Sequence, residues 1–243
     1  MIAMPRDCDD VAAPGWLLDE VANAGRENLD EAHAFRYDVK EDAGASHEVR
    51  LCQTLGLGPE STLVDLGAGT GQFALAVAAV CGRVVAVDVS PVMLDRLRAK
   101  VSDSGVGNIE MVQAGFLTYE HAGGPADFVY SRYALHHLPD FWKAVALGRL
   151  HQMLRPGGVL RLCDVVYHFE PGEAVDRLAS WCSSAGSGGD DGWSRVELEE
   201  HVRDEHSTFT WILEPMMERA GFRVEEASYS TDGIVATYVV RRA

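Results

Sequence analysis

The sequence is poor in positive charge. Its 243 residues include 21 Lys and Arg against 37 Asp and Glu, which gives a formal net charge of −16 at pH 7. Proteins that bind nucleic acids neutralise phosphates with clustered Lys and Arg, so a nucleic-acid partner is disfavoured. An anionic membrane surface is disfavoured for the same reason.

Long apolar runs and paired cysteines are also missing. No stretch of about 18 apolar residues occurs, as a membrane-spanning helix would need. The first twenty residues contain four Asp, one Arg and no apolar core of a signal peptide, so we expect a cytoplasmic protein. The five cysteines are scattered and form no Cys-x-x-Cys pair, which disfavours a zinc or redox site.

The rest of the chain alternates between short apolar runs and helical patterns. Strands are expected over 62–66, 83–88, 109–114, 126–131 and 159–166. Helices of about 10–15 residues separate most of them, which is typical of βαβ units. Two final strands, 222–229 and 233–240, are joined by a short turn that favours an antiparallel hairpin at one edge. The pattern predicts an α/β fold with a doubly wound, mostly parallel sheet.

Composition also divides the chain into regions. Residues 1–45 are acidic and Ala-rich with a weak helical pattern, and are interpreted as an N-terminal helical cap. Residues 46–243 form the main domain, with an insertion at about 169–211 that we expect to cover the substrate as a lid. The insertion contains a Gly-rich stretch, expected to be a mobile loop, and a capping box that starts a helix at Ser194.

The most informative segment is Val-Asp-Leu-Gly-Ala-Gly-Thr-Gly at 64–71. It follows a strand and opens a helix, where glycines let a ligand lie against backbone N–H groups. Asp88 ends the next strand, 88 − 67 = 21 residues after the first glycine, which suits a carboxylate that accepts both ribose hydroxyls. A dinucleotide fingerprint would need a third glycine where Gln72 stands. The spacing therefore disfavours a nicotinamide dinucleotide.

Together with Asp88, this segment resembles the motifs of class I S-adenosylmethionine-dependent methyltransferases of the small-molecule type. Two further segments are similar to that family: DFVYSRYALHHLPD at 127–140 and LRPGGVLRLCDVV at 154–166. The resemblance covers roughly 46–168. It implies a Rossmann-like, doubly wound, seven-stranded sheet, mostly parallel with an antiparallel edge strand, and S-adenosyl-L-methionine as the cofactor.

The resemblance also implies a set of cofactor-binding residues. Asp65 would hold the glycine-rich loop and the amino group of the cofactor, Asp88 the ribose, and Ser131 and Arg132 the sulfonium and carboxylate region. Where the family often has Gly-Asp-Ala after the third strand, this chain has Ala-Gly-Phe. That acidic contact to adenine is absent. The remaining implied contacts are Gly67, Ala68 and Gly69 to the methionine part, and Val89, Met93, Gly115 and Phe116 to the adenine, with core packing the alternative for Met93.

The catalytic candidates are polar residues expected at the carboxyl edge of the sheet. They are Tyr37, His136 and His206. The resemblance implies that Tyr37 folds over the reactive methyl group, and His136 is the one of the His-His pair expected to face the substrate. A proton-bearing methyl acceptor needs a general base, for which we consider His206. Tyr37 could equally be a packing residue, and His206 could be solvated. Tyr133 and Trp211 are candidate substrate contacts, with packing the alternative for aromatic residues of the insertion.

A metal site is not expected at the His-His pair that contains His136. Adjacent histidines point in different directions, and the sequence offers no obvious third ligand.

The expected function is transfer of a methyl group to a small metabolite, aromatic or amine-bearing, by in-line displacement. Two alternatives stay open: a nicotinamide-dependent oxidoreductase, and a non-catalytic, cofactor-binding regulatory subunit. The expected partner is a small-molecule substrate, with no nucleic acid and no membrane. A homodimer is left open.

Overall fold

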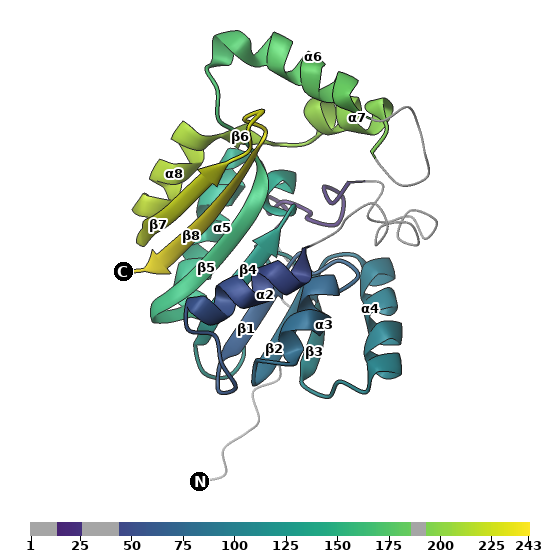
Figure 1. Cartoon of the computed structure of the whole chain (residues 1–243), viewed down its shortest axis with the longest axis vertical. Helices are drawn as coiled ribbons and strands as arrows, with labels where there is room; N and C mark the ends of the chain where they lie inside the picture. Colours follow the sequence, from purple (N-terminus) through teal and green to yellow (C-terminus); the bar gives the residue numbers. More distant parts are fainter. Residues whose placement is uncertain (1–13, 26–43, 186–192) are drawn as a thin grey trace.

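A computed structural model describes residues 14–25, 44–185 and 193–243 of the chain. A central sheet carries the fold, with strand order β3-β2-β1-β4-β5-β8-β7 (Figure 1). In that order its strands are β3 (Ile109–Gln113), β2 (Arg83–Asp88), β1 (Thr62–Leu66), β4 (Ala126–Arg132), β5 (Leu154–Tyr167), β8 (Val235–Arg242) and β7 (Phe222–Tyr229). An eighth strand, β6 (Thr208–Phe209), adds two residues beside the end of β5.

The strand directions confirm the predicted fold class. All neighbours from β3 to β5 pair in parallel. β8 is antiparallel to both β5 and β7, so it is the inner strand of the predicted hairpin and lies one place in from the edge. Reversing the chain within a four-residue turn allows only an antiparallel neighbour, which is why the hairpin could be predicted.

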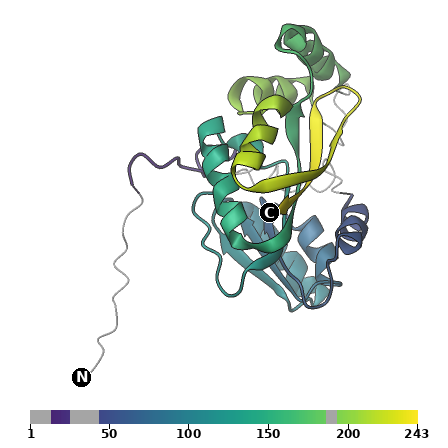
Figure 2. The same ribbon diagram turned by 90° about the vertical axis from the view of Figure 1, so that its left-hand side faces the viewer.

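Helices cover both faces of the sheet (Figure 2). One face packs against α2 (Ala45–Thr54), α3 (Gln72–Ala78) and α4 (Pro91–Ser104), and the other against α5 (Asp140–Met153) and α8 (Thr210–Arg219). Successive residues of β1 alternate between the two cores: Leu63 faces the first group of helices and Val64 the second. Strands buried on both faces are apolar almost throughout, which explains the continuous apolar runs of the sequence.

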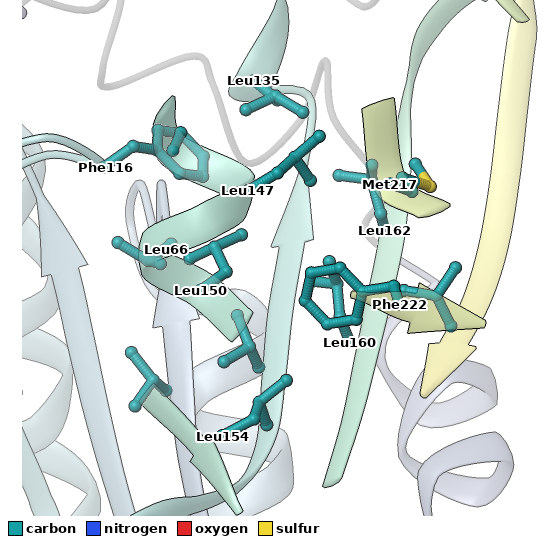
Figure 3. Close-up of a cluster of buried hydrophobic side chains, with 14 of the residues drawn as sticks. Leu66, Phe116, Leu135, Leu147, Leu150, Leu154, Leu160, Leu162, Met217 and Phe222 are labelled. Carbon is teal, nitrogen blue, oxygen red and sulfur yellow. The ribbon is translucent and has the colours of Figure 1, made fainter. Parts of the chain in front are cut away.

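The larger core lies between the sheet and the helices α5 and α8 (Figure 3). Leu147 and Leu150 of α5 pack there with Leu160 and Leu162 of β5, all at most 1% exposed. This core fixes the height of α5 relative to the strand ends. The loop that precedes α5 is therefore held above the carboxyl end of β4.

Local signals set the helix ends near the cofactor motifs. The Ser90 side chain caps α4 by accepting from the Met93 backbone N–H at 3.2 Å, with Pro91 in the first turn. The Ser194–Glu197 capping box forms as predicted and starts α7 (Arg195–Asp204).

Among the described helices, none is both long and apolar enough to cross a membrane.

The connection between β5 and α8 contributes a separate layer above the sheet (Figure 1). It contains η3 (Pro171–Glu173), α6 (Ala174–Ser184), α7 and β6, which we call the α6–α7 layer. An apolar cluster that includes Tyr167, Phe169 and Ile234 packs against Trp181 and Phe209 of this layer. The layer is therefore anchored to the ends of β5 and β8.

The described part of the N-terminal region, residues 14–25, forms turns where the sequence suggested a helix. The Asp19 carboxylate accepts from the backbone N–H groups of Val21 and Ala22, at 3.0 and 3.1 Å. Such a side-chain contact competes with helical hydrogen bonds and favours turns. We call residues 14–25 the N-terminal segment.

Candidate active site

The turn after β1 can be made only by glycines at its key positions. Gly67, Gly69 and Gly71 have φ angles of 75°, 53° and 80°, which lie in the left-handed region. A Cβ on Gly67 would lie 2.3 Å from the Ala134 Cβ, closer than any real contact. The turn therefore brings backbone directly against the loop that follows β4. The N–H groups of Gly67 and Ala68 donate to the Val87 carbonyl at 2.9 and 3.0 Å, which holds the turn against β2.

Asp88 links this turn to the loop after β2. Its Oδ2 accepts from the Gly69 N–H at 2.7 Å and its Oδ1 from the Ser90 N–H at 2.8 Å. The residue is 8% exposed, and burial raises the pKa of its carboxyl. Two backbone donors support the carboxylate in place, where it forms part of a cavity wall.

That cavity lies at the carboxyl ends of the parallel strands and is open to solvent. Parallel α/β sheets bind ligands at this edge. Its walls come from the N-terminal segment (Glu20, Ala24), from the β1 turn (Leu66, Gly67, Gly69), from the β2 loop (Asp88, Val89, Met93), from the β3 loop (Ala114, Gly115, Phe116) and from the β4 loop (Tyr133, Ala134, His137, Leu138). We call it the main cavity.

A second cavity adjoins the first on the other side of the glycine turn. Gly67, Gly69 and Tyr133 line both. Its remaining lining is Asp65, Ala68, Thr70, Gln72, Phe73, Tyr130 and Arg132. We call it the side cavity.

Asp65 is the group in the side cavity that most needs a ligand. Its Oδ2 is buried and has no hydrogen-bond partner among the described residues. Burial, reinforced by the charge of Asp88, raises the pKa of Asp65 to about 8. A buried carboxyl oxygen without a donor is costly, so this position suits an ammonium or other N–H donor from a ligand.

The structure brings almost all of the predicted cofactor residues together. Ten of the eleven line one of the two cavities: Asp65, Gly67, Ala68, Gly69, Asp88, Val89, Met93, Gly115, Phe116 and Arg132. The exception is Ser131, which is fully buried in β4 and lines neither cavity.

Tyr133, a predicted substrate contact, stands at the junction of the two cavities. Its φ of 51° is the single positive value among the non-glycine residues of the described chain. Its backbone N–H donates to the Cys163 carbonyl at 2.9 Å, and the Arg132 guanidinium lies 4.6 Å from its ring centroid. A tyrosine held in the left-handed region is strained, and such strain is concentrated at functional sites.

The adjacent histidines do not diverge as predicted, because their ring centroids lie 4.4 Å apart. His137 rather than His136 lines the main cavity. His136 is 6% exposed and its Nδ1 lies 2.5 Å from Asp164 Oδ1, while its Nε2 lies 2.9 Å from Glu205 Oε2. Glu205 Oε2 is also 2.5 Å from His201 Nδ1. We call Asp164, His136, Glu205 and His201 the ion cluster; it joins the sheet to α7.

The ion cluster sets opposite charge states for the two histidines. Burial by itself would lower the pKa of His136, but the charges of Asp164 and Glu205 outweigh it and raise this pKa to about 10. Burial, together with the charge of His136, lowers the pKa of His137 to about 3. His136 is thus an imidazolium at neutral pH, and His137 is a neutral imidazole in the cavity wall.

Three members of the ion cluster are also of the residue types that hold metal ions. Ligand atoms of His136, His201 and Glu205 all lie within 4.8 Å of one another. The carboxylate–imidazole separations of 2.5 and 2.9 Å are those of charge-assisted hydrogen bonds. Protons shared between these groups account for the geometry of the cluster.

His206, Trp211 and Tyr37 complete the predicted set. The backbone N–H of His206 donates to the His136 carbonyl at 2.9 Å, and its own carbonyl accepts from Lys143 Nζ. Burial and the charge of Lys143 lower the pKa of the His206 imidazole. Trp211 is 56% exposed; neither residue lines the two cavities. Tyr37 lies outside the described residues.

Sequence reasoning missed Ala134, Leu138 and Glu20 of the main cavity, and it favoured His136 over His137 as the histidine that faces the cavity. Ala134, His137 and Leu138 belong to a segment that was singled out, but the facing of each side chain depends on the short helix η2 (Leu135–His137). Glu20 comes from the N-terminal segment and carried no local signal.

Comparisons with known proteins agree with this site. The chain matches a family described as "Methyltransferase domain" over residues 63–158. It is 30% identical over 220 residues to the ubiquinone/menaquinone biosynthesis C-methyltransferase UbiE of Vibrio vulnificus (strain YJ016), covering 84% of this chain and 82% of the relative. It is 26% identical over 224 residues to the UbiE protein of Shewanella halifaxensis (strain HAW-EB4), covering 84% and 85%.

Among solved structures, the chain resembles the N-methyltransferase NodS from Bradyrhizobium japonicum WM9 in complex with S-adenosyl-L-homocysteine. The TM-score is 0.63 at 17% identity, over 93% of this chain and 99% of that one. Fold, site and relatives together define an S-adenosylmethionine-dependent enzyme. The chain belongs to the class I S-adenosylmethionine-dependent methyltransferases.

Proposed function

We propose that this enzyme holds S-adenosylmethionine across the main and side cavities and transfers a methyl group to a small metabolite, aromatic or amine-bearing. The observation that carries the proposal is the pair of buried carboxylates on either side of the glycine turn. Asp65 has an oxygen without a donor among the described residues, and Asp88 forms part of the main cavity wall. When bound, the cofactor supplies a methyl group on a sulfonium sulfur.

In this proposal, the amino-acid part of the cofactor lies in the side cavity, and its ribose and adenine lie in the main cavity. Asp65 accepts from the cofactor's ammonium in the side cavity, where Arg132 faces its carboxylate, and Ser131 supports this strand end from within the sheet. Asp88 accepts from the ribose hydroxyls. The glycine turn of Gly67, Ala68 and Gly69 lies against the methionine part, and Val89, Met93, Gly115 and Phe116 surround the adenine.

Tyr133 lines both cavities, and this position supports a role beside the reactive methyl group. His137 lines the main cavity as a neutral imidazole, so it can accept a hydrogen bond from an O–H or N–H of the acceptor. Such a bond aligns the acceptor for in-line displacement. His137 therefore joins Tyr37 and His206 as a candidate to handle the acceptor's proton. His136 is already an imidazolium that lines neither cavity, so its role is to position the cavity wall through the ion cluster. Trp211 is a candidate substrate contact at the α6–α7 layer.

The acceptor class is supported by the names of similar proteins. UbiE is named for C-methylation in ubiquinone and menaquinone biosynthesis, which favours an aromatic quinol. NodS is named as an N-methyltransferase, which keeps amines among the candidate acceptors. The net charge of −16 argues against a nucleic-acid acceptor.

The test is formation of S-adenosylhomocysteine from S-adenosylmethionine in the presence of candidate acceptors. A panel of reduced naphthoquinols and benzoquinols, simple phenols, indoles and primary amines covers the proposed class. We expect saturable transfer to at least one member, loss of transfer in Asp88→Ala, and normal transfer in the matched surface control Asp95→Ala. Cofactor binding without transfer to any member, or transfer only to RNA or protein, would contradict the proposal.

A further inference from the structure

Glu20 is a buried carboxylate brought into the main cavity by the N-terminal segment. It is 8% exposed, although it belongs to a segment of turns. Its Oε2 accepts from the Leu117 backbone N–H at 3.0 Å and from Thr118 Oγ1 at 3.2 Å. These bonds fasten the segment to the loop after β3, close to the carboxyl ends of the strands (Figure 1).

The loop after β3 is shaped to receive this carboxylate. A Cβ on Gly115 would lie 2.3 Å from Glu20 Oε1 and 2.6 Å from its Oε2. The φ of Gly115 is outside the left-handed region, so its backbone does not require glycine. What requires glycine is space: the Glu20 carboxylate occupies the position that a side chain of residue 115 would fill.

The position of Glu20 along the cavity indicates what it faces. Asp88 takes the ribose in the proposed function, and beyond it Val89, Met93 and Phe116 offer apolar walls for a planar base. Glu20 lines the same cavity. A carboxylate at the edge of a base pocket accepts hydrogen bonds from N–H groups and repels lone pairs.

The energetics favour a ligand contact over a tether alone. Burial raises the pKa of Glu20, while the backbone N–H of Leu117, the hydroxyl of Thr118 and the backbone N–H groups of Phe116 and Thr118 oppose that rise. Burying a carboxylate only to fasten a surface segment is costly, because neutral groups of similar size could pack there without losing hydration. A donor from a ligand offsets part of that cost.

We propose that Glu20 recognises the exocyclic amino group of the cofactor's adenine, so that the N-terminal segment closes over the cofactor through this contact. The inference rests on the proposed function, since it requires S-adenosylmethionine in the main cavity. Gly115 is the complementary residue: it leaves room for an acid supplied from 95 residues earlier in the chain.

Calorimetric titration with two ligands tests this contact. One is S-adenosylhomocysteine, and the other is its analogue with an unsubstituted purine, in which hydrogen replaces the amino group. The wild-type chain should prefer S-adenosylhomocysteine by at least about tenfold, as expected for a hydrogen bond to a charged acceptor. Glu20→Ala should bind the two ligands within about twofold of each other, with affinity for the analogue little changed. The exposed control Asp95→Ala, which lies outside the N-terminal segment, should keep the preference.

A rescue experiment separates recognition from tethering. Glu20→Ala combined with Gly115→Asp should regain the preference, because the new carboxylate grows from the position that Glu20 vacates. Glu20→Ala combined with Gly115→Ala fills the same space without charge and should not. Gly115→Asp alone should weaken binding of both ligands, because its Cβ overlaps the Glu20 carboxylate. Thermal unfolding checks each variant; if Glu20→Ala does not fold, Glu20→Gln takes its place and should lose at least threefold of the preference.

The outcomes distinguish this inference from the function on which it rests. A wild-type chain that fails to bind S-adenosylhomocysteine contradicts the proposed function. A wild-type chain that binds it but does not discriminate against the analogue overturns the role of Glu20 alone. Full discrimination in folded Glu20→Ala would overturn it as well.

Discussion

Buried acidic side chains at the carboxyl ends of the strands have different surroundings on the two sides of the sheet. On the β1–β2 side, Asp65 keeps an oxygen without a donor among the described residues, and Asp88 is supported only by backbone N–H groups. On the β5 side, Asp164 is 1% exposed but bonds to the His136 ring and backbone. His136 in turn contacts Glu205, which contacts His201.

This difference distinguishes a ligand-binding site from the ion cluster, which has a structural role. Charges that the chain pairs among themselves hold the α6–α7 layer to the sheet and need nothing further. Buried acids that the chain leaves without a full set of donors, such as Asp65, are held as carboxylates only when a ligand supplies the missing donor. The comparison assigns cofactor binding to the β1–β3 side and positioning of the α6–α7 layer to the ion cluster.

The largest expected effect is the loss of stability when the ion cluster is disrupted. Asp164→Asn removes the charge opposite a buried imidazolium and should lower the free energy of unfolding by about 3–5 kcal/mol. Urea denaturation followed by circular dichroism measures it, with the exposed Asp95→Asn as the control. In the folded variant, affinity for S-adenosylhomocysteine should change by less than about threefold, because Asp164 lines neither cavity. Unchanged stability, or loss of that affinity, would show that the two sides of the sheet are not separate.

The next effect concerns the ligand site alone. Asp88→Ala should weaken binding of S-adenosylhomocysteine by about 1–3 kcal/mol, because two charge-assisted hydrogen bonds to the ribose are lost. Titration calorimetry measures it, and Asp95→Ala should bind like the wild type. Equal affinity in Asp88→Ala would mean that the ribose lies elsewhere.

A pH series sharpens the role of Asp65. Its pKa is raised to about 8, so the free protein holds a proton there at pH 6. An ammonium ligand favours the carboxylate, so binding releases that proton, and affinity should rise by up to about fiftyfold between pH 6 and pH 8. Asp65→Asn should bind more weakly and lose this part of the pH dependence. Parallel slopes in the two proteins would remove Asp65 as the acceptor of the ammonium.

The smallest effect concerns His206. Its described bonds are made by the main chain, which Ala retains, so His206→Ala should change the free energy of unfolding by no more than about 0.5 kcal/mol. Turnover with an identified acceptor should fall more in His137→Ala than in His206→Ala, since only His137 lines the main cavity. The reverse order of turnover would restore His206 as the general base.

The cofactor side could be predicted because its signals are local. The glycine turn, Asp88 and the strand order all follow from short segments with known spacing. Ser131 shows the limit of such reasoning: unlike its neighbours Tyr130 and Arg132, it lines neither cavity and is fully buried within the sheet.

The other side could not be predicted because its contacts are long-range. His136 meets Asp164 from 28 residues away and Glu205 from 69, and no local pattern indicates either meeting. The same holds for Glu20. The only indication of it in the sequence is that Gly115 stands where the resembled family often has an acidic residue. The sequence could identify the His-His pair, but the direction of each ring was decided by η2 and by the charges that surround it.

Amide hydrogen exchange with and without S-adenosylhomocysteine tests the comparison most directly. Added protection should be concentrated in the glycine turn at 67–71, the loops at 88–93 and 114–118, and the N-terminal segment. Exchange in α6 and α7 should stay the same, because the ion cluster is complete without a ligand. Protection confined to α6 and α7, with none at the glycine turn, would contradict the account.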